Sequence, residues 1–162
     1  MNSKTENIKF ICPLITVTDM KISRNFYENI LGQTIVNDFG RNISFGAFAI
    51  HLQSHFKTLI DNKKVISGGN NFELYFEYND LEQICKKLKA ENVEFVHELQ
   101  EQPWKQLVLR FYDPDKNIIE IGESMEHLVF RLHKQNYYAD EISNMTGLDK
   151  EFIEKIINNL TQ

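Results

Sequence analysis

The sequence predicts an α+β fold made of two βαβββ modules, followed by a helical C-terminal extension. The main observation is an internal repeat. A strand, an aspartate and an apolar helical stretch occur around Asp19 and again 61 residues later around Asp80. Each copy then reaches a short apolar strand with one polar residue in its middle, His51 or Glu120. Because a repeat decides the architecture, we expect two small half-domains that face each other across a cleft.

The first module is expected over residues 8–56. Residues 8–18 are rich in Ile, Phe, Val and Thr, which is typical of a strand. Asp19 is placed to cap a helix over residues 20–31, which Gly32 ends. The expected core face of this helix has helical spacing and carries Ile22, Phe26, Tyr27, Ile30 and Leu31. Three strands should follow, near residues 33–39, 42–46 and 48–53, and then a polar linker over 57–70.

The second module is expected over residues 71–123. A strand over 72–78 leads to Asp80, which with Gln83 resembles a capping box for the second helix. That helix has an apolar stripe at helical spacing, formed by Leu81, Ile84, Cys85 and Leu88. Further strands are expected near residues 93–97, 106–112 and 117–122. Residues 113–117 form a turn, because Pro fixes φ and the Asp and Asn side chains bond the local backbone.

Strand alternation separates a core face of each sheet from a polar face. In the strand over 72–78, the apolar side chains should pack under the helix. The opposite faces of the predicted strands collect polar side chains, namely Cys12, His51, Glu73, Gln106, Arg110 and Glu120. A polar face of this kind is either solvated or a binding site.

Composition predicts a single compact, soluble domain. The 162 residues are 42% hydrophobic, and the formal net charge of -5 argues against a nucleic acid or an acidic membrane as partner. The polar first seven residues show no secretory signal, and no apolar run is long enough for a membrane span. Cys12 and Cys85 form no disulfide framework, so we expect a cytoplasmic protein with reduced thiols.

The repeat, the elements Phe26-Tyr27 and Leu31-Gly32, and the segments Tyr112-Asp113-Pro114-Asp115 and Ile119-Glu120-Ile121 together resemble the vicinal oxygen chelate superfamily. That superfamily includes glyoxalase I, bleomycin-resistance proteins, fosfomycin-modifying enzymes and extradiol dioxygenases. The resemblance covers about residues 8–123. It implies that each module curls half a barrel around a ligand cavity.

The resemblance also implies a site for a divalent metal such as zinc or nickel. The family's ligand positions fall on Cys12, His51, Glu73 and Glu120. Thiolate, imidazole and carboxylate groups would together suit a borderline divalent ion. Three of the four positions differ from the usual glyoxalase pattern, and only Glu120 matches it.

With a metal present, the expected reaction is proton abstraction next to a carbonyl, as in a lyase or isomerase. Glu120 is the expected base. Tyr75, Trp104, Gln106 and Arg110 are the expected substrate-binding residues, and an ordinary ion pair within the sheet is the alternative for Arg110. The competing function is a metal-free protein that binds a drug or another small molecule, with aromatic walls and a few polar groups.

Residues 124–162 lie beyond the family core and should form three helices, the last capped by Asp149. Two of them flank a turn at Gly147 and are similar to a helix-turn-helix, but acidic residues outnumber basic ones, which disfavours DNA. We expect the helices to dock through an apolar set: Met125, Leu128, Leu132, Phe152 and Ile156. The family resemblance implies a homodimer.

Overall fold

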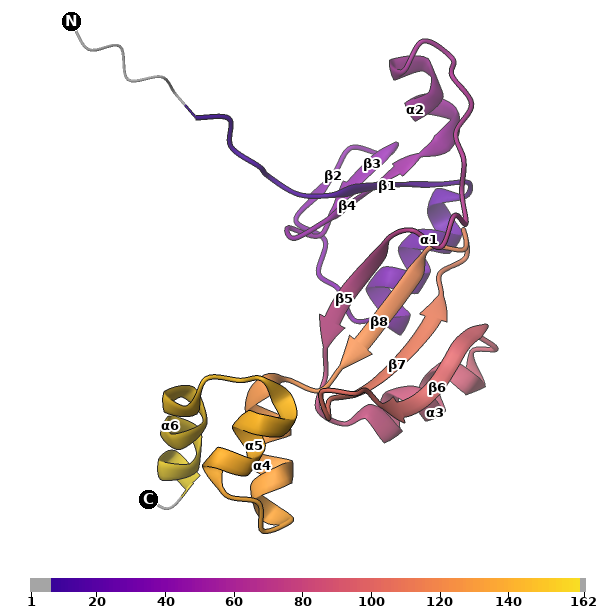
Figure 1. Ribbon diagram of the computed structural model, residues 1–162. Coiled ribbons are helices and arrows are strands. Elements are labelled where there is room, and N and C mark those ends of the chain that lie inside the picture. Colours follow the sequence, from indigo (N-terminus) through magenta and orange to yellow (C-terminus); the bar gives the residue numbers. More distant parts are fainter. Residues whose placement is uncertain (1–6, 161–162) are drawn as a thin grey trace, which may run out of the picture. The chain divides into compact units, whose positions relative to one another are not determined.

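The computed structural model describes residues 7–160, so the first six residues of the polar N-terminus lie outside the described part. The chain divides into two compact units, the first ending at Ser67 and the second beginning at Gly68. Each unit holds one mixed four-stranded sheet, and neither sheet is closed (Figure 1). The α+β prediction is therefore confirmed.

The first unit contains one βαβββ module and an additional helix. Its strands occur in the order β1-β4-β3-β2, with β1 parallel to β4 and the other pairs antiparallel. Its elements are β1 (Leu14–Val17), α1 (Met20–Asn25), the π-helical turn η1 (Phe26–Ile30), β2 (Asn37–Asp38), β3 (Asn42–Ser44), β4 (Ala49–Leu52) and α2 (Gln53–Leu59).

Three details of the first unit differ from the prediction. Helix α2 occupies residues that were expected to belong to a strand end and a linker. Ile22, expected in the core, is 55% exposed, whereas Ser23 is fully buried. The predicted helix also changes to a π-turn at Phe26, where the N–H of Leu31 binds the carbonyl of Phe26. A π-turn contains one more residue than an α-helical turn. The residues from Phe26 onward therefore do not keep the faces that α-helical spacing predicts.

The second unit repeats the same topology. Its sheet order is β5-β8-β7-β6, with β5 parallel to β8. The module consists of β5 (Glu73–Glu77), α3 (Leu81–Ala90), β6 (Phe95–Glu101), β7 (Leu107–Tyr112) and β8 (Ile118–Gly122). Asp19 and Asp80 accept backbone N–H bonds at the starts of α1 and α3, which confirms both predicted caps. The repeat is therefore a repeated fold, as predicted.

One face of the second sheet is apolar and forms the core with α3. Leu74, Leu109, Phe111 and Ile119 are almost fully buried there, together with Leu88 of the helix. The turn before β8 has the predicted chemistry. Asp113 Oδ1 accepts the N–H groups of Asp115 and Asn117 at 2.9 and 2.8 Å. The other face of the sheet is therefore free to carry polar groups.

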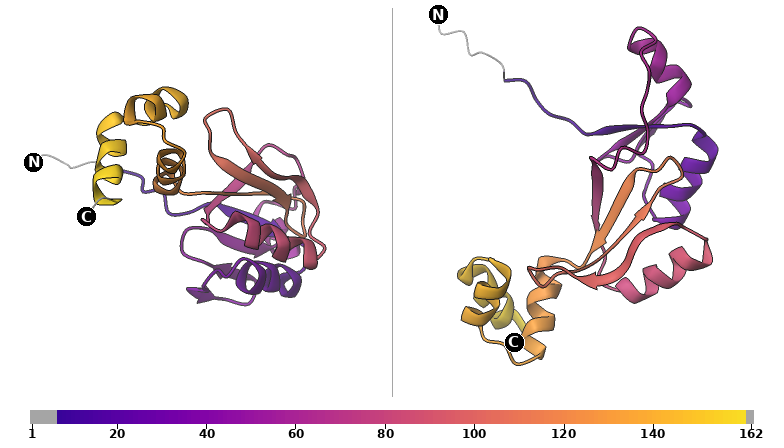
Figure 2. Two further views of the ribbon diagram at one scale, coloured as in Figure 1. Left: turned by 90° about the horizontal axis from the view of Figure 1, so that it is seen from below. Right: turned by 45° about the vertical axis from the view of Figure 1, so that its right-hand side comes forward.

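Three helices follow the second sheet: α4 (Met125–Lys134), α5 (Ala139–Thr146) and α6 (Lys150–Leu160). They gather beyond the end of β8 in the views of Figures 1 and 2. Their contacts form a small apolar core of their own, composed of Leu128, Val129, Leu132, Ile142 and Ile153. The other predicted docking residues, Met125, Phe152 and Ile156, pack against this core. None of the described helices has the length and apolarity that a membrane span requires.

Candidate functional site

The polar face of the second sheet brings together residues from three adjacent strands. The register pairs Tyr75 of β5 with Glu120 of β8, and Glu120 with Arg110 of β7. Residues paired in register point to the same face of a sheet. Three of the predicted site residues therefore lie side by side, as the alternation of the sequence predicted.

Arg110 is the electrostatic centre of this face. Its Nε donates to Glu73 Oε2 at 3.0 Å, and its Nη2 forms an ion pair with Glu120 Oε2. Its Nη1 lies 3.3 Å from His97 Nε2. Glu120 is buried, whereas Glu73 is exposed. Arg110 thus compensates the negative charge of a buried carboxylate, which would otherwise be costly to keep away from water.

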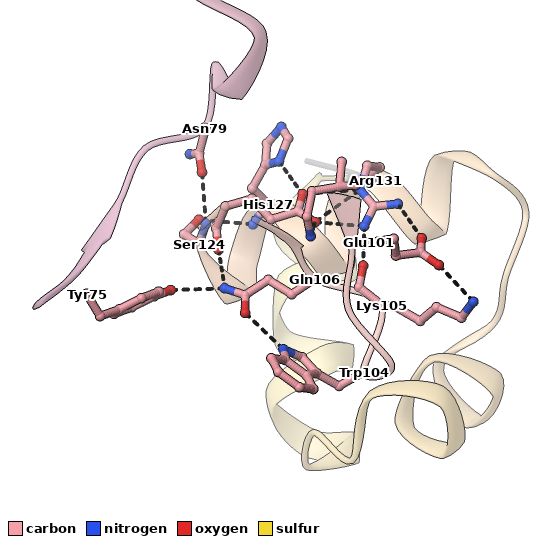
Figure 3. A network of polar contacts seen from close by, with 11 residues as sticks. Tyr75, Asn79, Glu101, Trp104, Lys105, Gln106, Ser124, His127 and Arg131 are labelled. Atoms are coloured by element: carbon pink, nitrogen blue, oxygen red, sulfur yellow. Dashed lines mark hydrogen bonds and ion pairs between the residues drawn. The ribbon is translucent and has the colours of Figure 1, made fainter. Parts of the chain in front are cut away.

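Gln106 fixes two exposed aromatic side chains beside this cluster. Its Nε2 donates to the hydroxyl of Tyr75 at 2.9 Å and to the carbonyl of Glu123 at 2.8 Å, and its Oε1 accepts Trp104 Nε1–H at 2.9 Å (Figure 3). Gln106 is 2% exposed, but Tyr75 and Trp104 are 45% and 41% exposed. A buried amide therefore holds two rings in place while leaving part of each ring open.

The Tyr75 hydroxyl stays protonated in this network. Burial raises the pKa of Tyr75, and the hydrogen bond from Gln106 offsets this only in part, while the nearby Glu77 carboxylate raises it further. The hydroxyl consequently donates to Glu77 Oε1, at 3.1 Å. Tyr75 thus accepts from Gln106 and donates to Glu77, so its orientation is fixed from two sides.

The close approach of Gln106 to the sheet requires glycine at position 122. A Cβ on Gly122 would lie 2.7 Å from Gln106 Nε2 and 3.2 Å from Tyr75 Cε2. We expect Gly122→Ala to displace Gln106 and lower the free energy of unfolding by about 1–3 kcal/mol, the usual range for overpacking. Urea denaturation measures this change.

Gly69→Ala is the matched control for that variant. A Cβ on Gly69 meets only the exposed amide of Asn71 at 2.9 Å, and that side chain can move. The control should therefore unfold at nearly the wild-type urea concentration. Equal stability of the two variants would show that the Gln106 contacts tolerate a methyl group.

A buried carboxylate that was not predicted from the sequence stands at the start of the C-terminal helices. Glu123 is fully buried and accepts Leu107 N–H at 2.9 Å and Arg131 Nη2 at 2.7 Å, both on Oε1. His127 Nδ1 lies 2.8 Å from Glu123 Oε2, and Arg131 also donates to the carbonyl of Lys105 (Figure 3). This network ties α4 to the hairpin between β6 and β7.

The first unit places His51 between two polar partners. Its Nδ1 lies 3.1 Å from Asn42 Nδ2, and its Nε2 lies 2.8 Å from His55 Nδ1 in the following helix. Burial lowers the pKa of His51, and repulsion from His55 lowers it further. Since an amide nitrogen only donates, His51 Nδ1 is the acceptor, so its Nε2–H donates to His55.

The strand registers correct one argument from the repeat. The sequence suggested that His51 and Glu120 occupy equivalent positions. Relative to the capping aspartates, Leu14 is equivalent to Tyr75, and these residues pair with Ala49 and Glu120 respectively. His51 pairs with Thr16, two residues further along. The equivalence was therefore wrong, because the short strand motifs do not reveal the register of β4 on β1.

The four predicted metal ligands are divided equally between the units. Cys12 precedes β1 in the first unit with His51, and Glu73 and Glu120 lie on β5 and β8 of the second. Both carboxylates already pair with the guanidinium of Arg110, a cation that cannot itself act as a metal ligand. Both ring nitrogens of His51 also have hydrogen-bond partners. This donor set does not fit a divalent cation as it stands.

No group of three His, Cys, Asp or Glu side chains within residues 7–160 is arranged to hold a metal. The convergence of Cys12, His51, Glu73 and Glu120 on one ion stays a prediction. Of the predicted substrate-binding residues, Tyr75, Trp104 and Gln106 form one hydrogen-bonded group. Arg110 forms ion pairs within the sheet, which is the alternative that the sequence left open.

Two sheets of βαβββ topology, each with an Asp-capped helix, and the Asp113 turn define the fold of the vicinal oxygen chelate superfamily. A family model described as Glyoxalase-like domain matches residues 10–126. The chain belongs to this family. The match ends near the start of α4, so most of the three C-terminal helices lie beyond it.

Solved structures share this fold. A protein of unknown function from Agrobacterium tumefaciens is 37% identical, with 76% of this chain and all of that chain covered and a TM-score of 0.68. A glyoxalase/bleomycin resistance protein/dioxygenase from Nocardioides is 17% identical over 74% of this chain and 86% of that one, with a TM-score of 0.57. A lactoylglutathione lyase from Agrobacterium tumefaciens is 16% identical over 73% and 96%, with a TM-score of 0.55. No curated protein matches the chain.

Proposed function

We propose that the protein binds a small molecule without a metal, on the polar face of the second sheet. The observation that carries this proposal is the position of Arg110, which binds Glu73 and Glu120 at once. A metal-dependent lyase or isomerase with Glu120 as base would need both carboxylates free of Arg110. The metal-free alternative uses the side chains as they stand.

The exposed rings of Tyr75 and Trp104 supply the binding surface. Small-molecule sites combine apolar and aromatic walls with a few fixed polar groups. Here Gln106 fixes both rings, and Glu77 adds an exposed carboxylate beside Tyr75. A planar molecule with N–H donors fits these groups, because its flat face can stack on an aromatic ring while its donors bind carboxylate oxygens.

Trp104 is the single tryptophan of the chain and reports binding directly. Planar aromatic compounds with basic groups, titrated into the metal-free protein, should change the Trp104 emission with saturation. Tyr75→Ala should weaken the binding at least about tenfold, which is 1.4 kcal/mol. Tyr78→Ala, which removes a hydroxyl that bonds Gln83 of α3 and lies outside the Gln106 network, is the control and should bind as the wild type does.

The metal-dependent alternative is tested on the same preparation. Metal content is measured after growth with added zinc and nickel, and lyase activity is assayed with and without these ions. Stoichiometric metal together with turnover that Glu120→Gln reduces about 100-fold would overturn the proposal. The proposal also includes a cytoplasmic location and a homodimer, and light scattering on the full chain tests the dimer.

A further inference from the structure

A cavity lies in the same unit, apart from the Tyr75 surface, between the start of α3 and helix α4. Its volume is about 480 Å³, within the usual range for small-molecule sites. Three leucines line it, Leu81, Leu99 and Leu107, and Glu123 and His127 line it from the base of α4. Neither Tyr75 nor Arg110 belongs to its wall.

The polar side of this cavity is a histidine whose ring is held by a buried carboxylate. Burial alone would raise the pKa of Glu123, but hydrogen bonds from Arg131, Leu107 N–H and His127 together hold it below the usual value. Glu123 is therefore ionised and can only accept hydrogen bonds. His127 Nδ1, 2.8 Å from Glu123 Oε2, must carry the proton.

This arrangement leaves a lone pair on the other ring nitrogen. In a neutral imidazole, one nitrogen is protonated and the other accepts, and the partner of one nitrogen sets the state of the other. The side chain of His127 is 33% exposed and lines the cavity, so the ring is partly open to a ligand. With its Nδ1–H directed at Glu123, the neutral ring presents Nε2 as a hydrogen-bond acceptor at the cavity wall.

We propose that this cavity is a second small-molecule site, which takes an organic amine with an apolar body and binds its N–H at His127 Nε2. Besides the buried Glu123, two exposed carboxylate side chains, Asp80 and Glu82, line the cavity, and no lysine or arginine does. A cation is therefore favoured over an anion by charge. The three leucines provide an apolar surface for the body of the ligand.

Nuclear magnetic resonance of the full chain tests this proposal with benzylamine as probe. In ¹⁵N-histidine-labelled protein, His127 should be protonated at Nδ1, and benzylamine should shift its Nε2 resonance. His133, on the same helix, serves as internal control and should not move. Benzyl alcohol should bind more weakly than benzylamine, and benzoate should bind most weakly.

Two variants separate a specific site from general adsorption. His127→Asn should weaken benzylamine binding at least about tenfold, while His133→Asn should leave it unchanged. A His127 ring protonated at Nε2, no shift with benzylamine, equal binding of benzoate, or unchanged binding by His127→Asn would each overturn the proposal. Since the tautomer is measured on the wild-type protein, the test holds even if a variant fails to fold.

Discussion

Replacing Glu123 by Gln should lower the free energy of unfolding by about 3 kcal/mol. The carboxylate is fully buried and pairs with Arg131, so its removal leaves this charge with only the longer ion pair to Glu101, at 3.7 Å. Breaking a buried ion pair in this way costs about 3–5 kcal/mol. We expect the lower end of this range, because the Arg131 side chain is 18% exposed to solvent. Urea denaturation at neutral pH measures the loss.

Glu126→Gln is the matched control, since Glu126 is an exposed acidic residue in the first turn of the same helix. Its effect should stay within about 0.5 kcal/mol, as for most surface substitutions. A Glu123→Gln variant as stable as this control would show that the buried pair contributes nothing to stability.

The Glu123 carboxylate should also make the stability of the protein depend on pH in the acidic range. Its pKa in the folded protein lies below the ordinary value of 4.5, so the unfolded state binds the proton more readily. The stabilisation is present in full above the unfolded pKa and is lost as the pH falls through the lowered folded pKa. Unfolding of the wild type should therefore depend more steeply on pH below about 4.5 than unfolding of Glu123→Gln. Parallel curves would contradict this.

Ile142→Ala should cost about 2–5 kcal/mol and unfold the three C-terminal helices before the sheets. Ile142 is fully buried in the small core of these helices, and a cavity at such a site costs this much. A core of only five buried residues contributes little stability, so the loss of one large side chain should unfold it. Hydrogen exchange should show lost protection in α4, α5 and α6, with protection retained in β5, β7 and β8.

Ile22→Ala is the control of equal chemistry, because Ile22 is exposed on α1. Its stability should remain close to that of the wild type. Simultaneous loss of protection in the helices and the sheet of Ile142→Ala would instead show that the second unit unfolds as one cooperative body.

Local chemistry predicted much of the fold. Asp19 and Asp80 cap helices by side-chain hydrogen bonds to nearby N–H groups, and Asp113 fixes a turn in the same way. Such interactions involve neighbouring residues and are visible in the sequence. Helix α2 was missed because its cap, Leu52, offers no side-chain hydrogen bond. The π-turn at Phe26 was missed because its backbone register has no composition signal.

The candidate site was predictable only in part. Strand alternation correctly placed Gln106, Arg110 and Glu120 on one face. It did not predict which side chain each of them contacts. Arg110 pairs with Glu120 because the register of β7 and β8 sets these two residues side by side. The role of Glu123 could have been suspected, since His127 and Arg131 follow it at intervals of four residues. That spacing is common on helix surfaces and does not reveal burial.

Both N–H bonds of the Gln106 amide are engaged, one on the Tyr75 hydroxyl and the other on the carbonyl of Glu123, just before α4. An amide group is planar, so the two bonds cannot be reoriented independently. A ligand that shifts the Tyr75 ring therefore also strains or releases the point where the C-terminal helices begin. If such a coupling exists, a ligand at Tyr75 and a partner of the helices would change each other's affinity by the same factor. Gln106 thus connects the Tyr75 ring directly to the residue before α4 through one side-chain amide.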